Sequence, residues 1–308
     1  RYDQNIDKIE NIYKSRFSNI FHLMPFYDGS KANVIPVYEK SIYFHGFIAQ
    51  GHTHFVRPYL NHYLFIADDL VLNPAINETN YQEYFNIDEN SSFLPHIIKL
   101  HEMKHYWPRI KEAFEYKLNI RGVEIKNELP NYDQAIKKLG QLGIMIKPLS
   151  PYQIYRLPGK SVKAWLRAIF YEKTKIISLM LGTLLNWEYK LTYPLIGSYS
   201  DIVVVSSNTI NKFCQYCGAF AATDLHVEVA LPTSLCLSAE IIKTEKDLKL
   251  HGKALWPDGW NRLHGENDLA DGDLAELDQF NYTLNTLLDR FPKNYLYLHP
   301  IKLSKWNI

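Results

Sequence analysis

The sequence predicts an α/β protein with a mixed, mostly parallel sheet and helices on both faces of that sheet. Apolar runs of strand length alternate along the 308 residues with segments of helical periodicity, and no long array of hairpins is visible. The clearest strand covers residues 62–69, an almost continuously apolar run that stops at two acids. Such a run is typical of a parallel strand that is covered on both faces and opens into a site at its carboxyl end.

The other elements follow from the same two patterns, taken in chain order. Apolar runs bounded by prolines or turn residues predict strands over residues 19–25, 33–38, 199–206 and 295–299. Apolar residues at helical spacing predict helices over residues 1–17, 93–118 with a break at Pro108, 133–142, 162–187, 209–220 and 280–291. Residues 41–55 fit either pattern, and Gly51 is expected to end a helix there.

Composition and charge narrow the class of protein. Hydrophobic residues make up 46% and charged residues 22%, which is ordinary for a soluble globular protein. The formal net charge of +1 argues against nucleic acid as the partner. The longest apolar stretch, residues 176–187, is too short for a transmembrane segment. Peripheral association with the inner face of a membrane stays compatible with the sequence.

The number and spacing of the cysteines indicate whether the protein works in an oxidising or a reducing compartment. Cys214, Cys217 and Cys236 are too few for a disulfide framework, and only the first two form a C-x-x-C pair. No second pair completes a zinc site of structural type. We expect three buried thiols in a reducing, cytoplasmic compartment.

The segment LFIADDLVLNP, residues 64–74, is the first that could carry chemistry. Adjacent carboxylates repel one another, and a divalent cation relieves that repulsion. Because side chains alternate along a strand, only one of Asp68 and Asp69 can point squarely at a shared ligand. A pair of acids that merely turns or caps the chain explains the pattern equally well.

This segment resembles the acidic motif at a strand end of GT-A glycosyltransferases, in which Asp residues hold a metal bound to a nucleotide-sugar diphosphate. Three later segments agree in order with that family, namely YPLIGSYSDIVVV at 193–205, FAATDLHVEVALPT at 220–233 and LYLHPIK at 296–302. The resemblance implies a GT-A-like, Rossmann-like fold over a single catalytic domain, residues 1–308. Residues 1–147 would form the nucleotide-sugar and metal half and residues 148–308 the acceptor half.

The resemblance also implies a function and a ligand set. The function is transfer of a sugar from a nucleotide-activated donor to a glycan acceptor, with Mn²⁺ or Mg²⁺ as the metal. The implied metal ligands are Asp68, Asp69 and His299, and Lys302 would neutralise phosphate. Gln50, in a stretch rich in Gly and His, is a further candidate for contact with the donor.

Sugar transfer with inversion needs a general base at the acceptor hydroxyl, and Glu228 or Asp201 could serve. We expect Glu228 to be the better candidate, because in an extended segment it points opposite to Val227 and Val229 and so faces the cleft. Apolar neighbours raise the pKa of a carboxyl toward the range useful for a base. Asp201 could instead turn the chain, and Glu228 could be a salt-bridged or capping residue.

Residues 256–278 are rich in Gly, Asp and Asn, which predicts a mobile loop. Trp256, Trp260 and His264 give it side chains for stacking on a sugar and for polar contacts with it. We expect this loop beside the cleft.

Two other functions remain open. The segment HEMKH matches the zinc-hydrolase pattern H-E-x-x-H, in which His101 and His105 would bind zinc and Glu102 would act as the base. The charge of Lys104 and the proline at 108 both argue against that interpretation. The chain could also be a non-catalytic carbohydrate-binding protein of the same fold.

Overall fold

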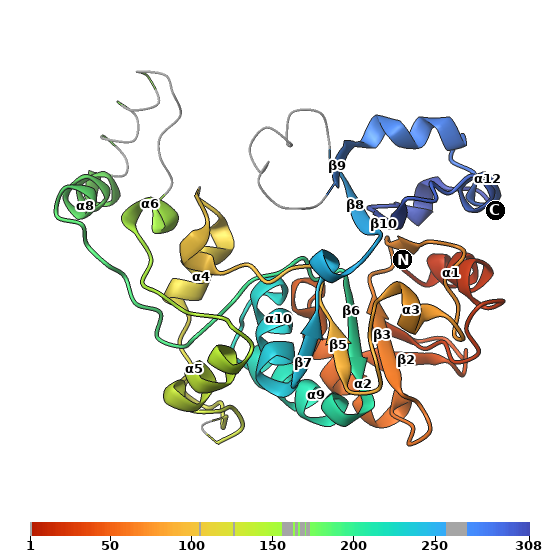
Figure 1. The fold of residues 1–308 in the computed structure, drawn as a ribbon, viewed down its shortest axis with the longest axis horizontal. Coiled ribbons are helices and arrows are strands. Elements are labelled where there is room, and N and C mark those ends of the chain that lie inside the picture. Colours follow the sequence, from red (N-terminus) through yellow and green to blue (C-terminus); the bar gives the residue numbers. More distant parts are fainter. Residues whose placement is uncertain are drawn as a thin grey trace.

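A four-stranded mixed sheet lies at the centre of the computed structural model (Figure 1). The strand order is β3-β6-β5-β7, in which β6 runs antiparallel to both β3 and β5, while β7 runs parallel to β5. These strands cover His62–Ile66 (β3), Ser91–Phe93 (β5), Ile202–Ser206 (β6) and Ile241–Lys243 (β7). The structure describes residues 2–104, 106–125, 127–155, 163, 166, 170, 173–256 and 270–308.

A second four-stranded sheet, of order β4-β10-β8-β9, follows from β3 through the turn that contains the two acids. Strand β10 runs antiparallel to β4 and parallel to β8, and β9 runs parallel to β8. A separate parallel pair, β1 with β2, completes the strands of the described residues. The bounds are His22–Pro25 (β1), Val34–Val37 (β2), Val71–Leu72 (β4), His251–Trp256 (β8), Ala270–Asp273 (β9) and Tyr295–His299 (β10).

Strand β6 is buried on both faces, which explains why its sequence IVVVS does not alternate. Val203 and Val205 pack in one core with Phe213 of α9, whereas Ile202 and Val204 belong to a second core. Helices α2 (Phe44–Phe55), α9 (Ser207–Ala222) and α10 (Val227–Ser238) line the first core. The second core is closed by β4, β10 and the residues near the carboxyl terminus. Each core combines residues from both halves of the sequence.

The remaining helices contain 4–12 residues, and α8 lies at the outer edge of the molecule (Figure 1). They cover Ile6–Tyr13 (α1), Tyr81–Tyr84 (α3), Pro108–Glu115 (α4), Tyr132–Gln141 (α5), Pro151–Ile154 (α6), Lys173–Leu184 (α8) and Leu284–Asp289 (α12). Short 3-10 turns cover Tyr2–Asn5, Ser41–Tyr43, Leu100–Glu102, Glu245–Asp247, Leu274–Phe280 and Leu303–Lys305. None of the helices in the described ranges is long and apolar enough for a membrane crossing.

The α/β class with a mixed sheet is confirmed, but the strand that ends at the acids is not parallel to its neighbour. β3 pairs antiparallel with β6 over its whole length, from His62 opposite Ser206 to Ile66 opposite Ile202. A strand that is buried on both faces has an apolar sequence whether its neighbour runs parallel or antiparallel. The sequence of β3 therefore does not reveal the direction of its partner.

Several element boundaries also differ from the prediction. Pro108 does not break a helix but begins α4, where the missing N–H of proline costs nothing. The segment before it contains β5 and a 3-10 turn instead of a helix. Gly51 lies inside α2, which continues to Phe55. The segment around Glu228, expected to be extended, is helical, because α10 begins at Val227.

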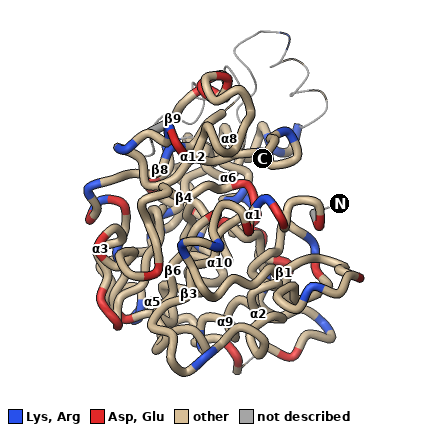
Figure 2. Tube along the Cα trace, turned by 90° about the vertical axis from the view of Figure 1, so that its right-hand side faces the viewer, with Lys and Arg blue, Asp and Glu red and all other residues tan. Residues whose placement is uncertain are grey.

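Charges of both signs occur along the described part of the chain. Figure 2 shows acidic and basic residues interspersed along the chain on the side that it presents, in agreement with the net charge of +1. The three cysteines are buried free thiols, as expected from the sequence. Burial raises the pKa of Cys214 to about 12.

The predicted loop at 256–278 is described only at its two ends. Trp256 ends β8, and β9 returns from Ala270 in parallel pairing with β8. Trp260 and His264 lie outside the described residues, as does most of the segment predicted to be mobile.

Candidate functional site

Two carboxylates come together at one edge of the central sheet because β3 and β6 are antiparallel. The β3–β6 pairing continues past Ile66, where the Ala67 N–H donates to the carbonyl oxygen of Asp201 at 2.8 Å. The turn that carries Asp69 follows directly. In an antiparallel pair, the carboxyl end of one strand meets the amino end of the other. Asp69 after β3 and Asp201 before β6 therefore emerge at the same edge.

Strand β10 brings His299 to this edge. Its register against β4 places Leu298 opposite Val71, so that the next residue of β10 continues toward the turn with the acids. The Ile301 N–H then donates to the carbonyl oxygen of Asp69 at 2.5 Å. This backbone contact fixes the end of β10 against the turn and holds His299 beside Asp69.

The three side chains form a compact cluster. His299 Nε2 lies 3.1 Å from Asp69 Oδ1 and 3.7 Å from Asp201 Oδ1. One ligand atom from each residue lies within 4.8 Å of the others. The three side chains are 12–26% exposed, so they are held by their surroundings yet open to a small ligand. Two carboxylate oxygens and one imidazole nitrogen are a donor set that suits Mn²⁺.

A lysine adds positive charge to the cluster. Lys302 Nζ donates to Asp69 Oδ2 at 2.5 Å, and its side chain is 60% exposed. Burial opposes ionisation of Asp69, but the hydrogen bonds and charges of His299 and Lys302 outweigh burial and lower its pKa to about 2. Burial lowers the pKa of Lys302, but its hydrogen bond and ion pair with Asp69 outweigh this and raise it. Asp69 is therefore a carboxylate at neutral pH.

Asp201 differs from Asp69 in its surroundings. Burial raises the pKa of Asp201, and the charge of Asp69 adds to that effect, while the charges of His299 and Lys302 oppose it. A cation between the two carboxylates would offset their repulsion and favour the ionised form of both.

Tyr199 orients the histidine and was missed by the sequence prediction. Its hydroxyl makes a short hydrogen bond with Nδ1 of His299, and its ring stacks on Tyr297 at 6.2 Å with an interplanar angle of 7°. When Nδ1 carries the proton, Nε2 presents its lone pair to the space beside Asp69 and Asp201. The signal was available, because Tyr199 stands two residues before Asp201 and thus on the same side of an extended segment.

The stack continues to a buried acid. The Tyr297 hydroxyl donates to Glu245 Oε1 at 2.6 Å, and the Gly252 N–H donates to Glu245 Oε2 at 3.1 Å. Glu245 is only 1% exposed. Gly252 is required beneath the ring, because a Cβ there would lie 1.9 Å from Cζ of Tyr297. The chain from Glu245 through Tyr297 and Tyr199 therefore sets the position of His299.

Two residues predicted at the site do not join the cluster. The carboxylate of Asp68 accepts a hydrogen bond from the side-chain amide of Asn5 at 3.2 Å. Gln50 lies on α2, and its side-chain oxygen accepts from the backbone N–H of Tyr38 at 2.7 Å. Asp201, predicted as a possible base, takes the position beside Asp69 and His299 that was predicted for Asp68.

Glu228 lies near the cluster but on a helix. It is in the first turn of α10, whose N-cap is His226, and it is 35% exposed. Arg109 Nε donates to its carboxylate at 3.0 Å, and its carbonyl oxygen accepts from the Ser198 N–H at 3.0 Å. Burial raises the pKa of Glu228 although Arg109 opposes the shift. Its side chain thus belongs to the edge that carries Tyr199 and Asp201.

The zinc-hydrolase motif does not form the helix that its chemistry needs. His101 and Glu102 end a 3-10 turn, and Met103 has an extended backbone with ψ of 126°. An α-helix through 101–105 would be required to place two imidazoles on one face. His105 lies outside the described residues.

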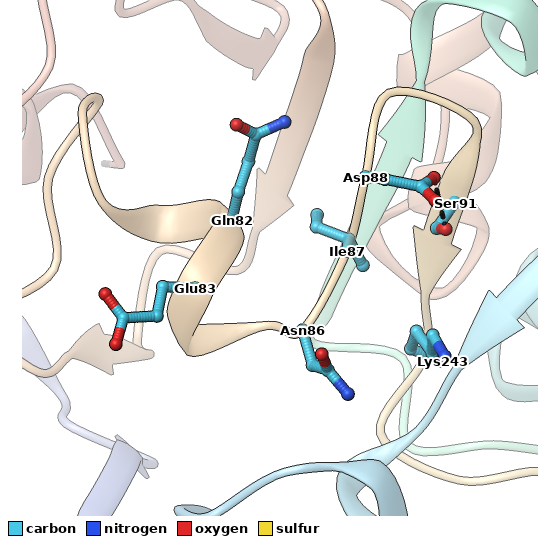
Figure 3. A pocket seen from close by; sticks show the side chains of 7 residues that line it. All are labelled: Gln82, Glu83, Asn86, Ile87, Asp88, Ser91 and Lys243. Carbon is cyan, nitrogen blue, oxygen red and sulfur yellow. Dashed lines mark hydrogen bonds between the residues drawn. The ribbon is translucent and has the colours of Figure 1, made fainter.

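A separate hollow lies between α3 and the start of β5 (Figure 3). The residues that line it are Gln82, Glu83, Asn86, Ile87, Asp88, Ser91 and Lys243. The carboxylate of Asp88 is already held by Ser91 Oγ at 2.6 Å and by the Asn90 N–H at 3.0 Å. We place the candidate site at the Asp69 cluster, because there, among the described residues, two carboxylates and an imidazole converge.

Comparisons with family models, with curated proteins and with solved structures gave no match for this chain.

Proposed function

We propose that the protein is a divalent-metal-dependent glycosyltransferase that moves a sugar from a nucleotide-activated donor to a glycan acceptor. The observation that carries the proposal is the convergence of Asp69, Asp201 and His299 from three separate parts of the chain. We further propose that the α/β fold is an arrangement of the GT-A type, because the segments that resemble that family supply all three residues.

The residues fit a divalent cation of the Mn²⁺ type. Such a cation is held well by carboxylate oxygens together with imidazole nitrogen, and Tyr199 supplies the second contact that orients the imidazole. When bound, the cation supplies a counter-charge for the diphosphate that leaves with the broken sugar–phosphate bond.

The protein's own cations complete the charge balance. Lys302 is 60% exposed on a flexible side chain, so it can leave Asp69 and reach a phosphate oxygen.

Glu228 would work at the acceptor, either by accepting the proton of the attacking hydroxyl or by binding the glycan. The raised pKa of Glu228 brings it closer to the range in which a carboxylate accepts a proton effectively.

Release of nucleoside diphosphate tests this proposal. The purified protein is incubated with Mn²⁺ and a panel of nucleotide sugars, and the diphosphate released is measured with and without glycan acceptors. We expect release from at least one donor, lowered about 10²-fold or more in Asp201→Asn, because the ligand set loses one charge. Asp68→Asn is the matched control and should retain activity, since Asp68 stands outside the cluster. Absence of release from every donor, or equal activity in Asp201→Asn, would contradict the proposal.

A further inference from the structure

Helix α8 is apolar on both of its faces. Ile176, Leu179 and Gly182 are buried. This face packs against α6, where a Cβ at Gly182 would lie 2.9 Å from Cγ of Pro151. A helix that is hydrophobic all round is normally covered all round. The second apolar face of α8 is exposed, as judged from the side chains that the structure describes.

The exposed face forms a continuous stripe that runs into the turn after the helix. Successive residues of an α-helix are 100° apart, so positions 177, 180, 181 and 184 share an arc opposite the buried stripe. Leu184 is 76% exposed and Met180 is 61% exposed. We call this stripe the α8 surface; its residues are Ile177, Met180, Leu181, Leu184, Leu185 and Trp187.

Exposed apolar side chains are concentrated here and are not scattered. Of the eighteen large apolar side chains that are exposed in the described ranges, eight lie between Leu166 and Trp187. Scattered exposed apolar residues need no explanation, whereas a contiguous group marks a surface for a membrane or a partner. Figure 1 places α8 at the outer edge of the molecule, on the side away from both termini.

The charges around the α8 surface are basic. Residues 172–190 contain three lysines and two glutamates, with Glu172, Lys173 and Lys175 at the start and Glu188 and Lys190 at the end, and the sequence of residues 156–167 adds two arginines and two lysines without an acid. An apolar stripe with lysines at its two ends matches a bilayer that contains anionic lipids, where apolar side chains enter the acyl boundary and lysines meet the headgroups. Trp187 adds a ring of the kind that favours the membrane interface.

We propose that the α8 surface docks on a lipid bilayer that contains anionic phospholipids, with the axis of α8 in the plane of the membrane. The twelve residues of α8 span about 18 Å, which is too short to cross the roughly 30 Å hydrocarbon core but sufficient for an interfacial helix. A second copy of the chain fits less well. In a parallel pair Lys173 and Lys175 of one copy would lie beside the same lysines of the other, and in an antiparallel pair they would meet Lys190 together with Glu188.

Vesicle sedimentation tests the proposal. Binding of the full chain is measured with vesicles of phosphatidylcholine alone and with vesicles in which phosphatidylglycerol replaces part of it. We expect binding to the second kind, weakened about tenfold or more by Leu185→Ser and further by Met180→Ser with Leu184→Ser. Ile308→Ser is the matched control, since Leu185 and Ile308 are both 58% exposed and Ile308 lies at the opposite side of the molecule.

Lys173→Gln combined with Lys190→Gln should lower binding to the anionic vesicles about tenfold or more, because each lysine near the surface contributes electrostatic attraction. The replaced side chains are exposed, so urea unfolding should show unchanged stability in every variant. Absence of binding to anionic vesicles would overturn the proposal. Equal loss in Ile308→Ser would also overturn it, as would a dimer in solution that the α8 variants abolish while vesicles bind nothing.

Discussion

His299 Nε2 lies 3.1 Å from Asp69 Oδ1, although 230 positions separate the two residues in the chain. Two backbone features produce this contact, the antiparallel register of β10 on β4 and the hydrogen bond from Ile301 to the carbonyl of Asp69. The pair is therefore fixed by main-chain structure and not by the side chains alone. Its chemistry should respond to changes in the residues that orient it.

Tyr199→Phe should weaken binding of Mn²⁺ about tenfold or more, because His299 loses the hydrogen bond at Nδ1 that sets its tautomer and orientation. The fold should be retained, since phenylalanine preserves the stacking on Tyr297. Titration calorimetry measures the affinity. Tyr282→Phe, which removes an exposed hydroxyl bound to Asp278, is the control and should leave the affinity unchanged. Equal affinities for Mn²⁺ in wild type and Tyr199→Phe would contradict the role of Tyr199 in orienting His299.

Glu228→Gln should lower turnover of sugar transfer about 10²-fold or more, the usual scale for a lost general base, without a change in metal binding. Glu112→Gln is a matched control, because both carboxylates pair with Arg109, whereas the backbone contact with Ser198 holds only Glu228 at the end of the segment that carries Asp201. The measurement is the rate with donor and acceptor at saturation. Near-normal turnover in Glu228→Gln, with Asp201→Asn inactive but folded and still able to bind metal, would make Asp201 the base.

Gly252→Ala should destabilise the fold by about 1–3 kcal/mol, because the new Cβ cannot avoid the Tyr297 ring without shifting the stack on Tyr199. The control is Gly140→Ala in α5, where nothing lies within 4 Å of a Cβ. That change should be neutral or stabilise by about 1 kcal/mol. Urea unfolding at neutral pH gives both values. A Gly252→Ala variant as stable as wild type would show that the ring position is not constrained by this glycine.

His45 should make the protein sensitive to acid. Burial, with the nearby His226 adding to it, lowers the pKa of His45 to about 3, whereas an unfolded histidine has a pKa near 6.5. The unfolded chain therefore binds one more proton between about pH 3 and 6.5. The stabilising contribution is complete above pH 6.5 and is lost as the pH falls, by at most about 1.4 kcal/mol per pH unit.

His45→Phe should reduce this loss, as judged by the free energy of unfolding at pH 5 and pH 7. His54→Phe, an exposed position on the same helix, should behave like wild type. An identical pH dependence in wild type and His45→Phe would contradict the assignment.

The sequence predicted the class of the fold, and it proposed as metal ligands two residues that the structure places together, Asp69 and His299, for identifiable reasons. The run before Asp69 could be recognised because its burial on both faces leaves a long apolar stretch. The late segment that ends in His299 stood out as a short strand closed by proline. What could not be predicted is pairing, because strand direction is decided by contacts far apart in the chain.

The place of Asp201 depends on that pairing. If β3 and β6 were parallel, the residue before β6 would lie at the opposite edge of the sheet from Asp69. Asp201 was consequently considered only as a base, and Asp68 was given its place. Glu228 was misread for a different reason, since the valines on both sides favour a strand locally and Pro232 argues against a helix interior. Residues 227–238 are nevertheless helical, because packing of α10 on α9 and capping by His226 stabilise the helix.

Calorimetric titration of Mn²⁺ into wild type, Asp69→Asn and Asp68→Asn tests the metal site most directly. We predict that wild type and Asp68→Asn bind one ion with similar affinity, because Asp68 contacts Asn5 and stands apart from the cluster. Asp69→Asn should bind at least about tenfold more weakly, because it removes a charged ligand from the set of three. Loss of binding in Asp68→Asn with normal binding in Asp69→Asn, or no binding by the wild type, would contradict the account.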